Sequence, residues 1–225
     1  MTVLDRLADP GIVPVVEIAA TERAAGLGRA LQAAGLPCAE VTFRTPAAAD
    51  AIRALRDACP ELLVGAGTIL RPEQVDAALA AGAAFLVAPG LNPRVVDRAR
   101  ERGVPMVPGV ATPTEIEGAL AVGLETLKFF PAEVTGGVAF LGAVAPVYPT
   151  VRFLPTGGID PSNVAAYLAR PNVLACGGSW MVRRDLIAAG AFAEIERLAA
   201  EAVALARTAR PGGPMPLPAG TSDAR

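Results

Sequence analysis

The segment GVPMVPGVATPTEIEGALAVG, residues 103–123, contains one complete strand and helix unit. Gly103 is typical of a residue that ends a helix in the left-handed conformation. The apolar pair at 106–107 predicts a short strand, and Thr112-Pro113 predicts a helix start, because proline fits the first helical turn. Gly123 is placed to end that helix. The segment therefore predicts a strand, a loop, a capped helix and a glycine, in that order.

The same unit recurs along the rest of the chain. Further helix starts are predicted at Thr45-Pro46, Arg71-Pro72, Asn92-Pro93 and Asp160-Pro161, and further helix ends at Gly35 and Gly82. Eight short apolar or β-branched runs predict strands at residues 12–16, 38–43, 62–64, 85–88, 106–107, 126–130, 151–154 and 173–176. Strands that alternate with helices favour a parallel sheet. We therefore predict an α/β fold with a single (β/α)8 TIM barrel, and an open doubly wound sheet is the alternative.

The length of 225 residues suits one barrel domain and leaves little room for a second. We assign residues 1–208 to the barrel, and we expect its last helix to run from Phe192 to Arg207. The chain ends in PGGPMPLPAGTSDAR, which is rich in Pro and Gly and poor in large apolar side chains. Residues 209–225 are therefore predicted to form a disordered tail.

Charge and composition indicate small-molecule partners. With 20 basic and 22 acidic residues and a pI near 5.3, the chain lacks the electrostatic footprint of a nucleic-acid-binding protein. The longest uncharged stretch, residues 134–151, is interrupted by five Gly and Pro residues, so no membrane association is expected. The first ten residues lack the pattern of a secretory signal, which predicts a cytoplasmic location.

Two features of the composition narrow the chemistry. The chain has no histidine, which removes the usual general base and the commonest metal ligand. Lys128 is the only lysine, and it lies in the apolar segment LKFFP at 127–131. Desolvation there disfavours the ammonium form, and a neutral amine can attack a ketone to give an iminium. The alternative is a lysine that extends from a strand end toward water.

Glu40 lies in an otherwise apolar strand, where an unpaired carboxylate would be costly. Alternation along the strand places Glu40 and Arg44 on the same side. One interpretation is an ion pair between these two residues. The other is Glu40 as acid and base beside an Arg44 that holds a substrate carboxylate. Glu17 and Glu133, at the ends of other strands, are rival carboxylates.

Two glycine-rich segments lie where barrels often bind phosphate. Thr156-Gly157-Gly158 follows the seventh predicted strand, and Gly177-Gly178-Ser179 follows the eighth. Exposed backbone N–H groups at such strand ends can bind an anion. Tight turns with positive φ are the alternative explanation for each glycine pair. Together the two segments predict a phosphate site.

With these residues assembled, the chain resembles the 2-keto-3-deoxy-6-phosphogluconate aldolase family, also known for cleaving 4-hydroxy-2-oxoglutarate. The likeness covers residues 10 to 205. The motifs that carry it are VPVV at 13–16, EVTFRT at 40–45, VGAGT at 64–68, PG at 89–90, PGV at 108–110, LKFFPAE at 127–133, PTGGI at 155–159 and GGSW at 177–180. Glu17 departs from the resemblance, because its counterpart in the family is often basic or apolar.

The resemblance implies a class I aldolase that needs no metal and no cofactor and assembles as a homotrimer. Lys128 would form the Schiff base and Glu40 would transfer protons. The substrate-binding residues implied by the resemblance and the glycine segments are Arg44 and Thr68 for the pyruvate carboxylate, Pro89 and Phe130 for the pocket wall, and Thr156, Gly157, Gly158, Gly178 and Ser179 for the phosphate. The expected reaction converts 2-keto-3-deoxy-6-phosphogluconate to pyruvate and glyceraldehyde 3-phosphate, a step of the Entner-Doudoroff pathway.

Two other functions remain open from the sequence. A phosphate-binding barrel isomerase or synthase would use the glycine segments without an imine, and Lys128 would then only pair a charge. A catalytically silent sugar-phosphate-binding protein would keep the pocket without turnover. Retention of both Lys128 and Glu40 argues against the silent protein.

Overall fold

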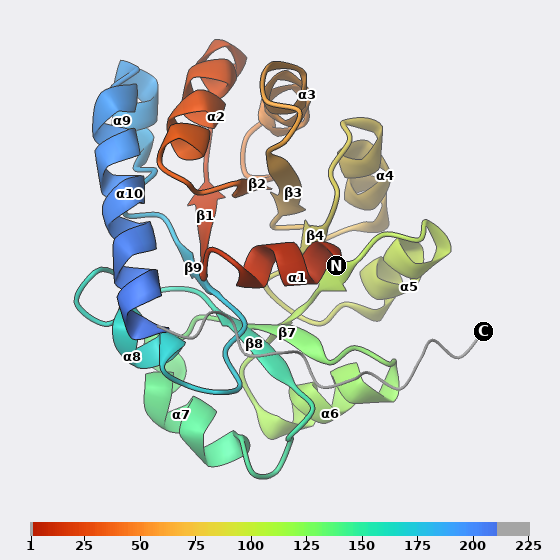
Figure 1. Cartoon of the computed structure of the whole chain (residues 1–225). Helices are drawn as coiled ribbons and strands as arrows, with labels where there is room; N and C mark the ends of the chain where they lie inside the picture. The colour runs from red at the N-terminus through yellow and green to blue at the C-terminus, as the bar shows by residue number, and fades with distance from the viewer. Residues whose placement is uncertain (1, 211–225) are drawn as a thin grey trace.

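The computed structural model describes residues 2–210, so most of the tail predicted at 209–225 lies outside the described residues. Strands and helices alternate around a ring (Figure 1). The first half comprises α1 (Val3–Ala8), β1 (Ile12–Val16), η1 (Thr21–Arg23), α2 (Ala24–Ala33), β2 (Cys38–Thr42), α3 (Ala48–Ala58), β3 (Leu63–Gly67), α4 (Pro72–Ala80), β4 (Leu86–Val87) and α5 (Pro93–Glu101).

The second half follows the same alternation. It comprises β5 (Met106–Val107), β6 (Gly109–Val110), α6 (Pro113–Ala121), β7 (Thr126–Phe129), η2 (Glu133–Thr135), α7 (Gly137–Val144), β8 (Arg152–Pro155), α8 (Val164–Leu168), β9 (Cys176–Gly178), α9 (Arg184–Ala189) and α10 (Phe192–Ala209). The described part of the chain contains no helix long and apolar enough to cross a membrane.

The strands are parallel and close into a barrel. One sheet has the order β5-β4-β3-β2-β1-β9 and another has the order β6-β7-β8. β5 and β6 are halves of one strand around Pro108, whose missing N–H interrupts the ladder. The two sheets also meet between β8 and β9. There the parallel bridges Phe153↔Val173 and Thr156↔Gly177 join β8 and the residue after it to β9 and the segment before it. The predicted barrel is confirmed, and the open doubly wound alternative is wrong.

Proline and glycine marked most helix boundaries correctly. α4, α5 and α6 begin with Pro72, Pro93 and Pro113. The Asn92 side chain caps α5, and the Thr112 side chain caps α6. The four predicted helix-ending glycines all have positive φ, namely Gly35, Gly82, Gly103 and Gly123. Sequence-local signals therefore set these ends.

Two predicted helix starts are wrong. The Thr45 hydroxyl donates to the carbonyl of Ile18, so it does not cap a helix, and α3 begins only at Ala48. The Asp160 carboxylate accepts from the N–H and hydroxyl of Ser162, which forms a local turn before α8 begins at Val164. The Thr45 hydroxyl is therefore engaged by a distant loop, whereas Asp160 caps the turn at 161–163 that precedes α8.

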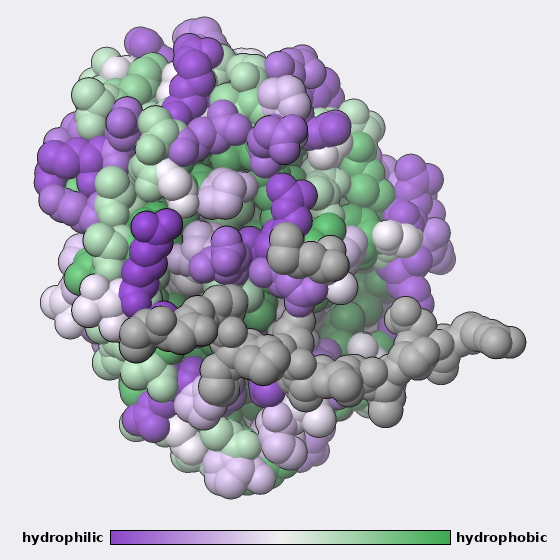
Figure 2. All heavy atoms as spheres, in the orientation of Figure 1, coloured by the Kyte–Doolittle hydropathy of each residue, from purple (hydrophilic) through white to green (hydrophobic). Residues whose placement is uncertain are grey.

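Two apolar cores hold the barrel together. The larger one fills the space between the strands and the surrounding helices. The smaller one fills the barrel interior, and α1 contributes Leu7, which is fully buried, to its N-terminal end. Figure 1 shows α1 lying across the middle of the ring, and Figure 2 shows hydrophilic residues over it in the same view. The N-terminal end of the barrel is therefore closed by a helix with a polar outer face.

Inward positions alternate along each strand, so a single glycine can decide how the interior packs. On β3 the inward residues are Leu63, Gly65 and Gly67. A Cβ at Gly65 would lie 2.3 Å from the ring of Phe85, which is fully buried. Gly65 is therefore required for the aromatic ring to fill the barrel centre.

We expect Gly65→Ala to lower the free energy of unfolding by about 1–3 kcal/mol, because the added methyl would force the fully buried Phe85 ring to shift within the core. Urea unfolding followed by circular dichroism measures the change. Gly90→Ala is the control, since a Cβ there meets nothing within 4 Å, and its change should stay within about 0.5 kcal/mol. Equal midpoints for both variants would contradict this packing account.

Candidate active site

A cavity of about 930 Å³ opens at the C-terminal ends of the strands, where barrel enzymes place their active sites. Among the predicted site residues, those that line it are Arg44, Phe130, Thr156, Gly157, Gly158, Gly178 and Ser179. Lys128 and Glu40 lie below, buried in the barrel interior. The structure therefore brings residues from β2, β7, β8 and β9 to one place.

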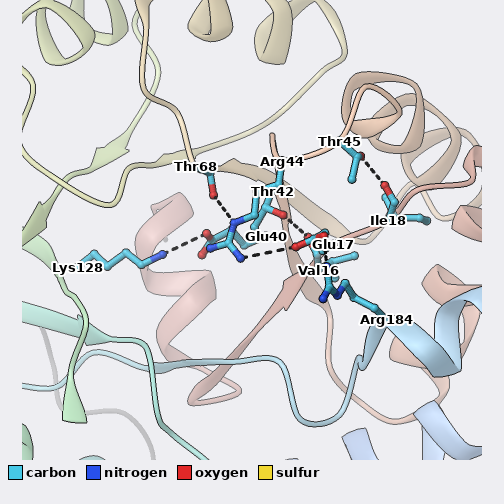
Figure 3. Close-up of polar contacts among 10 residues, drawn as sticks. All are labelled: Val16, Glu17, Ile18, Glu40, Thr42, Arg44, Thr45, Thr68, Lys128 and Arg184. Carbon is cyan, nitrogen blue, oxygen red and sulfur yellow. Dashed lines mark hydrogen bonds and ion pairs between the residues drawn. The ribbon is translucent and has the colours of Figure 1, made fainter. Parts of the chain in front are cut away.

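Lys128 and Glu40 form a buried ion pair. Nζ of Lys128 lies 3.3 Å from Oε1 of Glu40, and the two side chains are 5% and 0% exposed. Figure 3 shows the Lys128 side chain reaching across from one side toward the Glu40 carboxylate. Oε2 of Glu40 is buried without a hydrogen-bond partner among the described residues. Burial of an unpaired acceptor is costly, so this oxygen is available to take a proton or bind a substrate hydroxyl.

The strands fix this pair through alternation and through one close glycine. Glu40 is two residues from the inward Cys38, and Lys128 is paired in register with the inward Leu154. A Cβ at Gly67 would lie 2.1 Å from Oε1 of Glu40. Gly67 thus makes room for the carboxylate, and the Glu40 side chain is confined to the position that faces Lys128.

Arg44 lies above this pair and is held from two sides. Its Nε donates to Oγ1 of Thr68 over 3.3 Å, and its Nη1 lies 3.7 Å from Oε2 of Glu17. The ion pair between Arg44 and Glu40 is therefore wrong, because Lys128 pairs with Glu40 and Glu17 pairs with Arg44. Arg44 keeps donors that can face a carboxylate in the cavity.

Thr68 occupies a strained backbone conformation. Its φ is +59°, in the left-handed region that a β-branched residue rarely adopts. Such strain persists where the surrounding structure holds it, and it is common at binding sites. Here it follows directly after β3 and aims the Thr68 hydroxyl at Arg44. The backbone conformation of Thr68 therefore helps to hold the Arg44 guanidinium in position.

The two glycine segments form another wall of the cavity, with one difference from the prediction. Gly157 and Gly158 have φ of +99° and +79° and form the turn after β8. Gly177 and Gly178 instead lie inside β9 and are buried, and an added Cβ would collide with Thr156 at Gly177 and with the ring of Trp180 at Gly178. They do not follow the strand as expected, because the ladder with β1 extends through Val13↔Gly177 and Pro14↔Gly178. Ser179 is the first residue beyond the strand, and it is exposed.

The segment after Lys128 is tied to the glycine turn. The N–H groups of Ala132 and Glu133 donate to the carbonyls of Thr156 and Gly157 over 2.8 and 3.1 Å. The Glu133 side chain packs against Gly158, since a Cβ there would lie 2.6 Å from Cγ of Glu133. The Tyr167 hydroxyl donates to Oε1 of the same carboxylate. Glu133 therefore supports the turn, whereas the sequence indicated it as a rival catalytic carboxylate.

Some cavity residues were not predicted. Thr42, Trp180, Arg183 and Arg184 also line the cavity, and so does Glu17, which the sequence indicated as a rival carboxylate. The basic pair at 183–184 follows GGSW closely, and a search for cations near the second glycine segment would have found it. Pro89, by contrast, does not line the cavity, but its carbonyl packs against Gly109, where a Cβ would lie 2.1 Å away.

Neither metal sites nor reactive thiols are evident in residues 2–210. This range contains no group of three or more His, Cys, Asp or Glu that could hold a metal ion. Burial raises the pKa of the Cys38 thiol to about 12 and raises the pKa of the Cys176 thiol still further. Both thiols are therefore poor nucleophiles near neutral pH.

Comparisons with known proteins agree on one family. The sequence pattern of the family described as "KDPG and KHG aldolase" matches residues 3–198. The chain is 52% identical to the 2-dehydro-3-deoxy-phosphogluconate aldolase of Treponema pallidum, over 88% of this chain and 94% of that protein. It is 45% identical to the KHG/KDPG aldolase of Escherichia coli K12, over 85% of this chain and 90% of that protein.

Solved structures give the same result. The KDPG aldolase of Legionella pneumophila, with pyruvate captured at low pH as a covalent carbinolamine intermediate, superposes with a TM-score of 0.85. Its sequence is 38% identical, and the match covers 89% of this chain and 97% of that chain. The 4-hydroxy-2-oxoglutarate aldolase/2-deydro-3-deoxyphosphogluconate aldolase from TTHB1 has a TM-score of 0.84 and 46% identity, over 92% of this chain and 99% of that one.

We expect Tyr167→Phe to lower the free energy of unfolding by about 0.5–1.5 kcal/mol, because the buried ring loses its hydrogen bond to the carboxylate of Glu133, which is itself exposed to water. Burial, and then the contact with Glu133, raise the pKa of Tyr167 above its usual value near 10. This contribution is present below pH 10 and is lost as the pH rises above it, so the stability of the variant should fall less steeply in that range. Urea unfolding at pH 7 to 11 measures both effects. Parallel stability curves for the two proteins would contradict this account.

Proposed function

The chain belongs to the KDPG and KHG aldolase family, and we propose that it cleaves 2-keto-3-deoxy-6-phosphogluconate to pyruvate and glyceraldehyde 3-phosphate through a Schiff base on Lys128. The observation that carries the proposal is the buried Lys128–Glu40 pair below the 930 Å³ cavity. A single amine is thereby placed beside a single carboxylate, and both are shielded from water.

The proposed reaction begins with proton transfer from Nζ of Lys128 to Glu40. The neutral amine attacks the C2 ketone, and the resulting carbinolamine loses its hydroxyl as water when Glu40 returns a proton. The product is an iminium at C2, which withdraws electrons from the adjoining C3–C4 bond. The short Lys128–Glu40 distance lets one carboxylate serve both proton transfers.

Bond cleavage uses the same carboxylate. Glu40, directly or through a water, takes the proton of the C4 hydroxyl, and the C3–C4 electrons move into the iminium to give an enamine. The C4 fragment leaves as glyceraldehyde 3-phosphate. The enamine is protonated at C3 and hydrolysed, which frees pyruvate and the Lys128 amine. The unpartnered Oε2 of Glu40 is the oxygen free to face the substrate.

The cavity walls match the two ends of such a substrate. Arg44, with Thr68 behind it, offers donors to the pyruvate carboxylate. Gly157, Gly158, Gly178 and Ser179 line the same cavity and would hold the phosphate. Phe130 lies between, with its ring centroid 5.4 Å from Nζ of Lys128, and would form an apolar wall. Pro89 supports the interior through Gly109 without touching the cavity.

Further properties of the protein are also proposals. The Escherichia coli relative is named as an aldolase for both KHG and KDPG. This name supports the proposal that the chain also cleaves 4-hydroxy-2-oxoglutarate to pyruvate and glyoxylate. A homotrimer and a cytoplasmic location rest on the resemblance and on the sequence. Val134, which is 81% exposed on η2, is an apolar side chain available for subunit contacts. Native mass spectrometry measures the assembly.

We expect incubation with pyruvate and borohydride to add the mass of one reduced pyruvate adduct, and peptide mapping to locate it at Lys128. Lys128→Met should abolish both the adduct and cleavage, because the chain has no second lysine. An adduct elsewhere, or cleavage by the variant, would sink the proposal. The absence of both the adduct and cleavage would instead support an isomerase-type barrel without an imine, and an adduct without cleavage would support a silent binding protein.

We expect Glu40→Gln to lower kcat by about 10²–10⁴-fold while the protein stays folded, because Lys128 loses its proton acceptor. Gly67→Ala should act in the same direction, since the added methyl displaces the carboxylate. Glu61→Gln, the same chemical change at an exposed position, is the control. Steady-state kinetics and circular dichroism measure activity and folding. A kcat that differs little from the control value would remove Glu40 from proton transfer.

A further inference from the structure

Glu17 bridges two arginines with separate oxygens. Its Oε2 lies 3.7 Å from Nη1 of Arg44, and its Oε1 accepts from Nη1 of Arg184 over 2.7 Å. Figure 3 shows the resulting row of side chains, in which Lys128 and Glu40 lie on one side and Glu17 and Arg184 on the other. The row leads from the buried amine to the more exposed part of the cavity, since the Arg184 side chain is 74% exposed.

Arg184 is placed at the far end of this row by the chain beyond β9. It is the first residue of α9, shortly after Ser179, and it lines the same cavity as Ser179 and Gly158. Glu17, Arg184 and Asp185 also border a second cavity of about 390 Å³. The Glu17–Arg184 pair thus stands where the two cavities meet, with open space on both sides.

The charges around this pair do not cancel. Arg183 is bound by its neighbour Asp185 through Nε over 3.0 Å. Arg44 and Arg184 must therefore share the one carboxylate of Glu17, which leaves an excess positive charge on the cavity wall. Arg184 retains N–H donors that Glu17 does not use. An anionic group that enters this part of the cavity would meet directed donors and an excess of positive charge.

We propose that Arg184 is a specificity-determining residue that binds the terminal anionic group of the aldehyde half of the substrate, and that Glu17 is its positioning residue. The inference rests on the proposed function, because Lys128 fixes the keto end of the substrate and the row of charges fixes the direction of the other end. Guanidinium and phosphate form strong charge-assisted hydrogen bonds, so the preferred class is a phosphorylated aldehyde.

Glu17 contributes orientation in this proposal. Two guanidinium groups on one wall repel each other, and a carboxylate between them holds both in place. An exposed ion pair of this kind adds little to stability, so substitutions here should leave the protein folded. The effect of Glu17 on Arg44 acts on the keto acid end, which all substrates share. Its effect on Arg184 acts only on substrates with a distal anion.

The test compares kcat/KM for 2-keto-3-deoxy-6-phosphogluconate with kcat/KM for the same sugar acid without phosphate. Arg184→Ala should lower the value for the phosphorylated substrate by about tenfold or more, mainly through KM, and change the other by less than about twofold. Arg184→Lys should recover part of the loss. Arg183→Ala removes the same charge from the same wall, and it should retain most of the preference for phosphate because Asp185 occupies that guanidinium.

Glu17→Gln tests the positioning role. The preference for the phosphorylated substrate should fall, by less than in Arg184→Ala, and the double variant should show the preference of Arg184→Ala alone. A higher preference in Glu17→Gln would mean that the carboxylate only repels the phosphate, and this would overturn the positioning role. An unchanged preference in Arg184→Ala, or an equal loss in Arg183→Ala, would overturn the specificity role.

The same measurements separate this inference from the proposed function. If the parent protein cleaves neither substrate and pyruvate leaves no adduct at Lys128, the proposed function fails. If the parent protein cleaves both and forms the adduct while Arg184→Ala keeps the full preference for phosphate, only the inference about Arg184 fails.

Discussion

The barrel is arranged around one buried ion pair between Lys128 and Glu40. Removing two charges from water costs several kcal/mol for each ion, and their attraction offsets this cost only when the geometry is fixed. Most of the surrounding features serve that geometry. Gly67 leaves space for the carboxylate, and the apolar barrel interior below excludes water. A pair that is costly to bury and incompletely hydrogen-bonded is a poor means of stabilising a fold, but it suits proton transfer.

The loops that follow five strands, namely β1, β2, β3, β7 and β8, are connected so that the ion pair and the cavity stay aligned. The segment after Lys128 is hydrogen-bonded to the glycine turn after β8, and the Glu133 side chain packs against that turn. Elsewhere around the cavity, Thr68 and Glu17 hold Arg44 from two sides. In the proposed reaction the carboxylate of the substrate would be held by groups that follow β2 and β3, and the phosphate by groups that follow β8 and β9. This arrangement favours a substrate of defined length, because neither end can shift without losing contacts.

Much of the fold and the inward placement of two charged residues could be predicted from the sequence because their signals are local, whereas their pairing with each other was not predicted. A lone lysine on an apolar strand and a carboxylate inside another identified Lys128 and Glu40, and strand alternation pointed both inward. The partners of Glu17 could not be found in this way. They come from residues far apart in the sequence, and their meeting depends on how the ring closes. The helix start expected at Thr45 failed for the same reason, since its hydroxyl is bound to a carbonyl in a different loop.

The single lysine has a practical consequence for chemical labelling. Arginine fills every other basic position, so a reagent that acylates amines finds only one side chain on this protein, and that side chain is buried beneath the cavity. Apart from the amino terminus, the surface offers such reagents no target. Amide formation at Lys128 would therefore report how freely small molecules enter the barrel, and occupancy of the cavity would slow it.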